Sequence, residues 1–390
     1  MTRIGTRFVG LVGMAFILAA LLGLGSCGGG VGTGGTGSFA SGPVTGFGSV
    51  IVSGVAYDDS RTAVLDDDGL PLAGAQALRL GMTLDVEGSL PAGAPGAWRA
   101  TATRVQLRTA LVGPVVSVDP GTGRLVVLGQ EVTVTPVTVL DSRLPGGLRA
   151  LRPGAVVAVH GVPDGSAVLA SRIEPAVAGS AWRLRGPVAE YDAAAARLRI
   201  GGTVLDLRAT PALPTDLAVG RIVVATLDPV LSAVPAGGLP VRRLTGAEGS
   251  ADGTKVLLEG VLTRLNAVWS INGQTLDLSF ASVEPAGLVL APGLFANVTG
   301  EQRGGQVRVE RIELLGRAGL EARPFQVAGT LSAFDSGTRR GAVRGVDIDF
   351  STAAFPGGNP VRLVVGAAVR VQGPLTADGT VLRAQRVFFD

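Results

Sequence analysis

The 390-residue sequence contains only one cysteine, one histidine and one lysine. A single cysteine excludes disulfide bonds within the chain, and together with the single histidine it excludes most metal sites and nucleophiles that use these residues. Aromatic residues make up 4% and charged residues 17% of the chain, against about a quarter charged in typical domains. The net charge of +3 comes from arginines nearly balanced by acids, so no basic surface for nucleic acid is indicated.

Apolar residues and glycine are abundant: 46% of the chain is apolar, and there are 59 glycines and 23 prolines. This apolar content excludes disorder of the whole chain. At roughly 100 to 200 residues per domain, the length predicts two to four domains, or more if the units are small and repeated. The chain is long enough to bury a substantial core.

The N-terminus has the pattern of a secretory signal peptide. Arg3 and Arg7 precede an apolar run over 8–24, and small residues lead to the cysteine at position 27. The alternative is a transmembrane anchor, but a run of this length, broken by glycines, is short for a bilayer of roughly 30 Å, and no basic cluster follows it. We expect a signal peptide over 1–26 and a flexible Gly/Thr/Ser tether over 27–42.

The segment Leu24-Gly25-Ser26-Cys27 resembles a bacterial lipobox. The resemblance implies cleavage before Cys27, a thioether-linked lipid on its thiol and acylation of the new amine. Several acyl chains anchor a protein far more firmly than one. Lipoproteins kept in the inner membrane usually carry Asp after the cysteine, whereas this chain has Gly28. We therefore expect an exported protein anchored in the bacterial outer membrane, on a face that the sequence does not specify.

The remaining chain repeats itself. Four units open with a glycine that lies six residues before an Asp or Asn suited to a turn: Gly113 with Asp119, Gly186 with Asp192, Gly260 with Asn266, and Gly329 with Asp335. A second apolar run then breaks at a glycine in each of five units: Gly54, Gly129, Gly202, Gly273 and Gly345. Asn272-Gly273 is the strongest turn signal, since a type I′ hairpin needs positive φ at both positions.

Each unit closes in a similar way. Two glycines seven residues apart flank an apolar run, which predicts a strand between two glycine turns: 81–88, 154–161, 293–300 and 366–373. The third unit keeps Gly220 but has Leu227 at the second glycine position. A final strand carries an arginine in all five units: Arg104, Arg172, Arg243, Arg311 and Arg386. The five units are expected at 43–107, 110–176, 183–247, 256–315 and 326–390.

The pattern predicts an all-β fold. Five short strands per unit, with a long connection between the third and fourth, are typical of a small five-stranded Greek-key barrel of the OB type. The connections over 144–151 and 211–217 can each form one helical turn. Units of this size barely bury a sufficient core, so neighbouring units are expected to pack or to be tightly linked. We therefore expect a tandem array of five OB-like barrels, arranged as an extended string of beads after the signal peptide and Gly-rich tether.

The sequence also resembles a known family. The motifs that carry the resemblance are the 46–55 opening GFGSVIVSGV, the turn 66–69 DDDG, Leu80-Gly81-Met82 and Val86-Glu87-Gly88. They are similar to bacterial proteins built from domain of unknown function 5666, and the likeness extends over the mature chain except at Leu227. The resemblance implies exported, often lipidated, tandem β-domains. It supplies no activity and no catalytic residues.

Three groups of side chains are candidates for binding. Asp66, Asp67 and Asp68 are weak candidates for a calcium site, but their spacing lacks the first ligand of a calcium loop, and an Asp-Gly turn is favoured. The five recurring arginines can line a face for anionic glycan or lipid headgroups, although local pairing with acids is favoured. Sugars can stack on tryptophans, but filling barrel ends is favoured for Trp98, Trp182 and Trp269. The only histidine, His160, is expected to face solvent on a strand.

No constellation of catalytic residues recurs in the units. We therefore expect a lipid-anchored, non-catalytic envelope protein with a binding or structural role and no cofactor. Its expected partners are the membrane, through the lipid on Cys27, and an envelope glycan or protein, but not nucleic acid. One alternative is a carbohydrate- or anion-binding module that uses the recurring Arg and Trp residues. A second is an envelope enzyme with one active unit.

Overall fold

The computed structural model describes residues 37–74, 77–94, 96–177, 179–229, 237–247, 249–317 and 324–389. The signal peptide, Cys27 and the tether up to residue 36 lie outside the described residues. The fold is all-β, with short 3₁₀ turns such as η2 (Gly147–Ala150) and η3 (Pro360–Arg362). Within the described part of the chain, no helix is long and apolar enough to span a bilayer.

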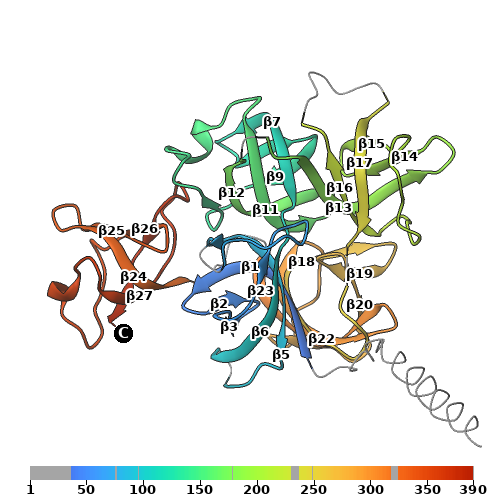
Figure 1. Ribbon diagram of the computed structural model, residues 1–390. Coiled ribbons are helices and arrows are strands. Elements are labelled where there is room, and N and C mark those ends of the chain that lie inside the picture. Colours follow the sequence, from blue (N-terminus) through green and yellow to red (C-terminus); the bar gives the residue numbers. More distant parts are fainter. Residues whose placement is uncertain are drawn as a thin grey trace, which may run out of the picture. The chain divides into compact units, whose positions relative to one another are not determined.

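The strands form small barrel-like sheets (Figure 1). The first, which we call ring 1, contains β1 (Gly37–Phe47), β2 (Val50–Val52), β3 (Val55–Asp58), β4 (Val64–Leu65), β5 (Thr83–Ser89) and β6 (Trp98–Leu107). Pairing runs from β1 through β2, β3, β6 and β5 back to β1, so the ring closes. The β3–β6 pair is parallel and the other four are antiparallel, while the short β4 lies parallel to another part of β6.

Rings 2 and 3 close by the same order of pairs. Ring 2 consists of β7 (Leu111–Asp119), β8 (Arg124–Val127), β9 (Gln130–Thr133), β10 (Val139–Leu140), β11 (Val156–Asp164) and β12 (Ala167–Pro175). Ring 3 consists of β13 (Trp182–Asp192), β14 (Arg197–Ile200), β15 (Thr203–Asp206), β16 (Ile222–Leu227) and β17 (Leu239–Gly246).

Rings 4 and 5 complete the set. Ring 4 consists of β18 (Lys255–Leu265), β19 (Val268–Ile271), β20 (Gln274–Asp277), β21 (Ser282–Glu284), β22 (Leu294–Arg303) and β23 (Gln306–Arg317). Ring 5 consists of β24 (Phe325–Asp335), β25 (Arg340–Val343), β26 (Val346–Asp349), β27 (Ala368–Gly373), β28 (Leu382–Arg383) and β29 (Arg386–Phe389). In ring 5 the last strand of the circuit is split into β28 and β29.

The predicted turns are confirmed where local chemistry decides them. Asn272 and Gly273 have φ of 49° and 81°, as a type I′ turn between β19 and β20 requires. The Asp119 carboxylate at the end of β7 accepts a hydrogen bond from the Gly121 amide at 2.9 Å, and Asp335 does the same for Gly337 at 2.8 Å. A 3₁₀ turn forms within 144–151, but no helix forms over 211–217, where that prediction is wrong.

The paired glycines of the fourth strand have two different roles. The first of each pair has positive φ, as at Gly154 with 88°, and lies in a turn as predicted. The second does not lie in a turn: Gly161 is inside β11, where the pairing with β12 shifts register between His160 and Gly161. A Cβ atom there would lie well within 3.0 Å of the Leu169 carbonyl oxygen. The prediction of a second turn is wrong because the bulge brings two backbones together, and that contact requires glycine.

Two other predictions of chain organisation are also wrong. The tether was expected to reach residue 42, but residues 37–42 belong to β1, where they pair with β5. The extended string of beads also fails, because rings distant in sequence pair with each other. Residues 38–41 of β1 run parallel to β18, and Gly46 and Phe47 run parallel to β24. Among the described strands, only the β7–β13 pairing joins rings that are consecutive in sequence.

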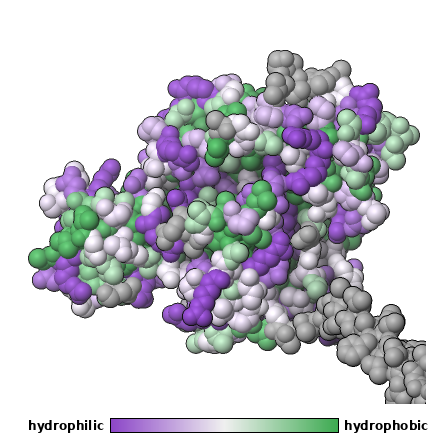
Figure 2. Space-filling model, in the orientation of Figure 1, coloured by the Kyte–Doolittle hydropathy of each residue, from purple (hydrophilic) through white to green (hydrophobic). Residues whose placement is uncertain are grey.

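Shared cores accompany these pairings. One cluster of buried side chains combines residues of rings 1 and 5, such as Phe47, Tyr57 and Phe350. A second combines residues of rings 2 and 3, such as Leu111, Ile173 and Leu184. The expectation that small units pack against one another is therefore confirmed. On the face drawn in Figure 2, hydrophobic and hydrophilic residues are interspersed.

Candidate functional site

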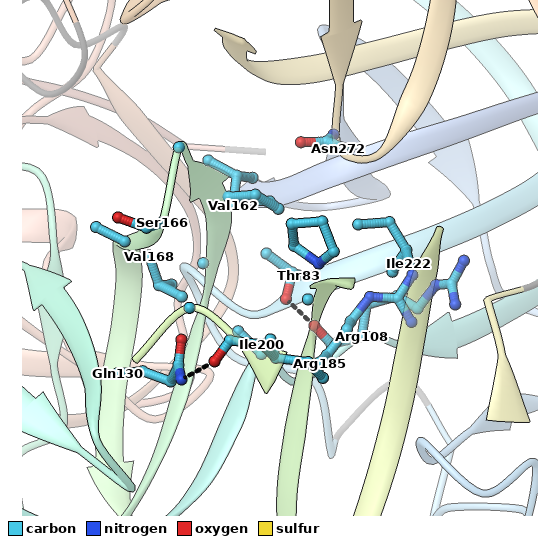
Figure 3. A pocket seen from close by; sticks show the side chains of 18 of the residues that line it. Thr83, Arg108, Gln130, Val162, Ser166, Val168, Arg185, Ile200, Ile222 and Asn272 are labelled. Carbon is cyan, nitrogen blue, oxygen red and sulfur yellow. Dashed lines mark hydrogen bonds between the residues drawn. The ribbon is translucent and has the colours of Figure 1, made fainter. Parts of the chain in front are cut away.

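A small cavity of about 60 Å³ lies where strands of four rings meet (Figure 3). Ring 1 contributes Thr83 at the start of β5, ring 2 contributes Gln130 of β9, ring 3 contributes Arg185 of β13, and ring 4 contributes Asn272. Arg108, in the connection between rings 1 and 2, completes the charged part of the lining. The cavity exists only because the rings pack together, since no single ring supplies its wall.

Hydrogen bonds fix much of this lining. The side-chain amide of Gln130 donates to the Ile200 carbonyl at 2.6 Å and to the Thr203 hydroxyl at 2.7 Å, joining rings 2 and 3. The Thr83 hydroxyl donates to the Arg108 carbonyl oxygen. The Asn272 side chain donates to the Glu259 carbonyl at 2.9 Å. The Gln130 and Thr83 side chains thus hold the wall together, whereas the buried amide oxygen of Asn272 has no hydrogen-bond partner among the described residues. The guanidinium groups supply the charge of the cavity.

Arg108 and Arg185 extend side by side along the cavity (Figure 3). Arg108 pairs with the buried Asp85 of β5. Burial is the main cause that lowers the pKa of Arg185 to about 9; the nearby positive charge of Arg108 acts in the same direction, while Asp85 and Asp67 act in the opposite direction. The site therefore places positive charge where solvation is poor.

The acidic turn predicted as a weak calcium candidate serves another purpose. Asp66 accepts hydrogen bonds from the amides of Asp68 and Leu70, both at 2.9 Å, and Gly69 has φ of 80°, so the favoured Asp-Gly turn is confirmed. Asp67 accepts from the Thr109 amide at 2.7 Å. Asp68 pairs with Arg183 at 2.7 Å and also with Arg243. The three carboxylates thus bind protein groups, and the described residues contain no cluster of three or more metal-ligating side chains.

The five recurring arginines occupy equivalent positions but different environments. In four units the arginine lies opposite the residue just before a register shift in the partner strand, and in the fifth it lies opposite the residue just before that strand ends. The pairs are Glu87 with Arg104, His160 with Arg172, Thr226 with Arg243, Thr299 with Arg311, and Gln372 with Arg386. Arg172 is only 5% exposed, so it cannot belong to a shared surface, and its candidacy for such a face is wrong.

Three of the other four arginines pair with acids, two of them within their own ring and Arg243 with the acidic turn of ring 1. Arg104 lies 3.3 Å from Glu87, Arg311 lies 2.5 Å from Glu284, and Arg243 pairs with Asp68. Arg386 lies over the ring of Phe388, with 5.7 Å from its guanidinium carbon to the ring centroid. Pairing with acids therefore describes these side chains better than a common binding face does. The nearby partner favoured from the sequence is present at Arg172, which pairs with Glu174, whereas Arg243 pairs with an acid of another ring.

Arg172 stands at the centre of a buried charged cluster. Its Nε donates to Glu174 at 2.7 Å, another nitrogen pairs with Asp141, and a third donates to the Leu80 carbonyl of ring 1 at 3.3 Å. Burial raises the pKa of Glu174, but the nearby His160 imidazole and the charge of Arg172 outweigh it and bring the value to about 2.

His160 belongs to the same cluster, and the prediction that it faces solvent is wrong. It is 2% exposed, with Nε2 lying 3.8 Å from Glu174. Strand alternation alone favours an outward side chain at a polar position, but the packing of ring 1 against β12 covers this face, as the Arg172–Leu80 contact shows. The burial therefore depends on a neighbouring ring.

The tryptophans do not gather in one place. Trp182 is buried in the core shared by rings 2 and 3, in line with the favoured structural role. Trp269 packs beside Arg264, whose guanidinium carbon lies 5.3 Å from its ring centroid. Trp98, at the start of β6, is 36% exposed. No sugar-stacking platform of several tryptophans follows from these positions.

Sequence reasoning missed Arg185. It precedes the recurrent Gly186 in a stretch that reads Trp182-Arg183-Leu184-Arg185, with two arginines on one face of a strand. The other units have apolar or uncharged polar residues before their opening glycines, except for Glu259. This local departure from the repeat was the available signal, since a charge added to a core-forming strand requires a partner or a ligand.

A larger, mostly apolar cavity of about 370 Å³ lies elsewhere, lined by residues that include Val162, Leu169, Phe295 and Phe325. It brings together residues of rings 1, 2, 4 and 5. Its lining offers shape and apolar surface, whereas the smaller cavity holds the arginine pair.

Comparison with known families assigns part of the chain. A family model described as Domain of unknown function (DUF5666) matches residues 112–174, which covers nearly all of ring 2. No curated protein matches the sequence.

Proposed function

We propose that the protein is a lipid-anchored component of the bacterial cell envelope, built from five tandem OB-like Greek-key barrels and acting without catalysis. The observation that carries the barrel assignment is the recurring circuit of pairs in rings 1 to 5. Each circuit has five strands when the short strands β4, β10 and β21 are left out and β28 and β29 are counted as one. In each ring the first of these five strands pairs with the second and fourth, and the third runs parallel to the fifth. This order matches a closed five-stranded Greek-key barrel.

A binding or structural role is supported by what recurs among the rings. The recurrent residues are turn formers, glycines at close backbone contacts and arginines with local partners. They determine backbone geometry and do not assemble the same chemical groups in every ring. A protein of this kind supplies surfaces and spacing at the membrane, with an envelope protein or glycan as partner. Carbohydrate or anion binding through the five recurring arginines loses support, because Arg172 is buried.

Membrane attachment is supported by the lipobox-like sequence ending at Cys27. The Cys27→Ala variant is expected to lose partitioning into the detergent phase during detergent phase separation, because the thiol that carries the lipid is gone. Ser26→Ala is the matched control, since it keeps a small residue at the cleavage site and should partition like the parent protein. Equal partitioning of the Cys27→Ala variant and the parent protein would rule out the anchor.

The non-catalytic role has its own test. The full chain is incubated with a panel of peptidoglycan, polysaccharide and lipid substrates, and the products are followed by mass spectrometry. No turnover is expected. Turnover that disappears on substitution of one carboxylate would overturn the proposal in favour of an enzyme with one active barrel.

A further inference from the structure

Arg185 differs from the arginines around it. Arg183 pairs with Asp68, and Arg108 pairs with Asp85. For the side chain of Arg185, the described residues provide neither a hydrogen bond nor an ion pair, although this side chain is partly buried between rings. Removing a guanidinium from water without a partner is costly, so a position of this kind favours a bound anion.

The acids near Arg185 do not contact its guanidinium directly. The groups that act on it electrostatically are Arg108, Arg183, Asp85 and Asp67. Asp85 pairs with Arg108, and Asp67 accepts hydrogen bonds from the amide and hydroxyl of Thr109. Both acids therefore make their direct contacts with other groups, and the guanidinium donors of Arg185 have no hydrogen-bond acceptor among the described side chains, although Asp67 and Asp85 offset part of its charge.

The adjoining cavity is large enough for a small ligand. One water molecule needs about 10–15 Å³ measured in this way, so a space of about 60 Å³ accommodates a ligand of about four or five non-hydrogen atoms. A guanidinium presents donors in a planar fork that matches a carboxylate or phosphate. The apolar neighbours Ile200 and Ile222 reduce competition from water.

We propose that the cavity between rings 1 to 4 binds a small oxyanion, held by the guanidinium of Arg185 while Arg108 adds positive charge. The ligand class comprises inorganic phosphate, sulfate and small carboxylates. Because the wall includes residues from four rings, the bound anion stabilises their association. This inference does not depend on the lipid anchor or on the absence of catalysis.

The test measures binding of inorganic phosphate to the full chain in detergent solution by calorimetry and thermal unfolding. Ionic strength is held constant with sodium chloride, and phosphate stays at millimolar concentrations, where general salt effects are small. Saturable binding and a rise in Tm are expected. Sulfate and acetate, titrated separately, identify which oxyanion the cavity prefers. If none of the three binds, the proposal is overturned.

Variants identify the site. Arg185→Gln is expected to weaken binding by about tenfold or more, because it removes a charge-assisted contact. Its Tm without anion should equal or exceed that of the parent, since an unpaired buried charge is gone. Arg208→Gln is the matched control: Arg208 is exposed, pairs with Asp206 two residues away and should leave binding unchanged. Unchanged binding by Arg185→Gln would overturn the assignment.

Arg185→Lys provides a second test should the glutamine variant fold poorly. Lysine keeps the positive charge but cannot form the planar two-donor contact. Weaker binding with a native-like thermal transition supports recognition by the guanidinium, whereas binding equal to that of the parent overturns it.

Discussion

A residue's position in the repeat does not determine its environment. Arg104 and Arg172 lie at equivalent positions of their final strands, each opposite a residue of the fourth strand. The Arg104 side chain is 38% exposed and pairs with Glu87 at the surface, whereas Arg172 is enclosed with Glu174, Asp141 and His160. Surface pairs of this kind contribute at most about 1 kcal/mol, while a buried charge that loses its partner costs several times more.

The buried cluster predicts a dependence of stability on pH. The pKa of Glu174 is lowered from 4.5 to about 2 in the folded protein. Its contribution is therefore fully present above about pH 4.5 and is lost as the pH falls towards 2. A shift of this size corresponds to about 3 kcal/mol of unfolding free energy. Glu174→Gln should be less stable at pH 7 and should lose less stability than the parent between pH 5 and 2.

Denaturant unfolding at pH 7, 5, 4 and 3 measures this effect. Glu87→Gln serves as the control, because its carboxylate lies in an exposed pair, and we expect its stability at pH 7 to change by less than about 1 kcal/mol. Parallel pH profiles for Glu174→Gln and the parent would contradict the prediction.

At the residue scale, sequence reasoning succeeded where a side chain acts on its own backbone. Asp66 and Asp119 bond to amides within four residues, which composition and spacing indicate directly. It failed for His160, Arg172 and Arg185, because their burial is created by other rings. The ion pairs of Asp68 could not be predicted for the same reason, since its partners are more than 100 residues away along the chain.

At the element scale, the recurring glycines lie where neighbouring strands and turns come too close for a side chain. The opening glycine of each unit makes room for the hairpin that follows: a Cβ atom on Gly113 would collide with the side chain of Leu128, and one on Gly260 with that of Asn272. The second glycine of the fourth strand makes room for the fifth strand at a bulge. The period was readable from sequence because these contacts repeat. The kind of contact could not be predicted from the sequence, because a glycine in a turn and a glycine at a close backbone contact are the same letter in the repeat.

The bulge glycines predict a specific sensitivity. Gly161→Ala should lower the unfolding free energy by about 1–3 kcal/mol, because the new methyl group meets the Leu169 carbonyl oxygen and forces β11 and β12 apart. Gly121→Ala, in the exposed turn after β7, meets only the Asp119 carboxylate at 3.3 Å and should stay within about 0.5 kcal/mol of the parent. Chemical denaturation compares the two variants, and equal stabilities would refute the close-contact explanation.

At the scale of the whole molecule, the acidic turn of ring 1 connects distant parts of the chain. Asp68 accepts hydrogen bonds from Arg183 of β13 and Arg243 of β17, both in ring 3. Arg183 is 8% exposed, so this contact lies inside the assembly of rings. The sequence predicted an all-β fold with short strands in each unit, but not which units contact each other. Pairing between rings depends on surface residues and strand edges that do not follow the repeating sequence pattern.

Removing this connection should destabilise the assembly of rings. Asp68→Ala leaves the buried Arg183 without its carboxylate and should cost about 1.5–3 kcal/mol. The double variant Asp68→Ala/Arg183→Met should recover part of that loss, because neither charge then remains buried. Asp228→Ala, from an exposed pair with Arg242, is the control and should change stability by less than about 1 kcal/mol. A double variant no more stable than Asp68→Ala would contradict the burial argument.

The parallel pairing of β1 with β18 and β24 also sets the order in which the chain can assemble. A polypeptide delivered from its N-terminus presents β1 long before residues 255–258 and 326–327 become available to pair with it. During that interval the outer edge of β1 offers free amide and carbonyl groups to any passing strand. Until β18 and β24 are available, this unpaired edge of ring 1 can associate with other chains. A chain truncated before β18 would keep the edge exposed, whereas the complete fold covers it.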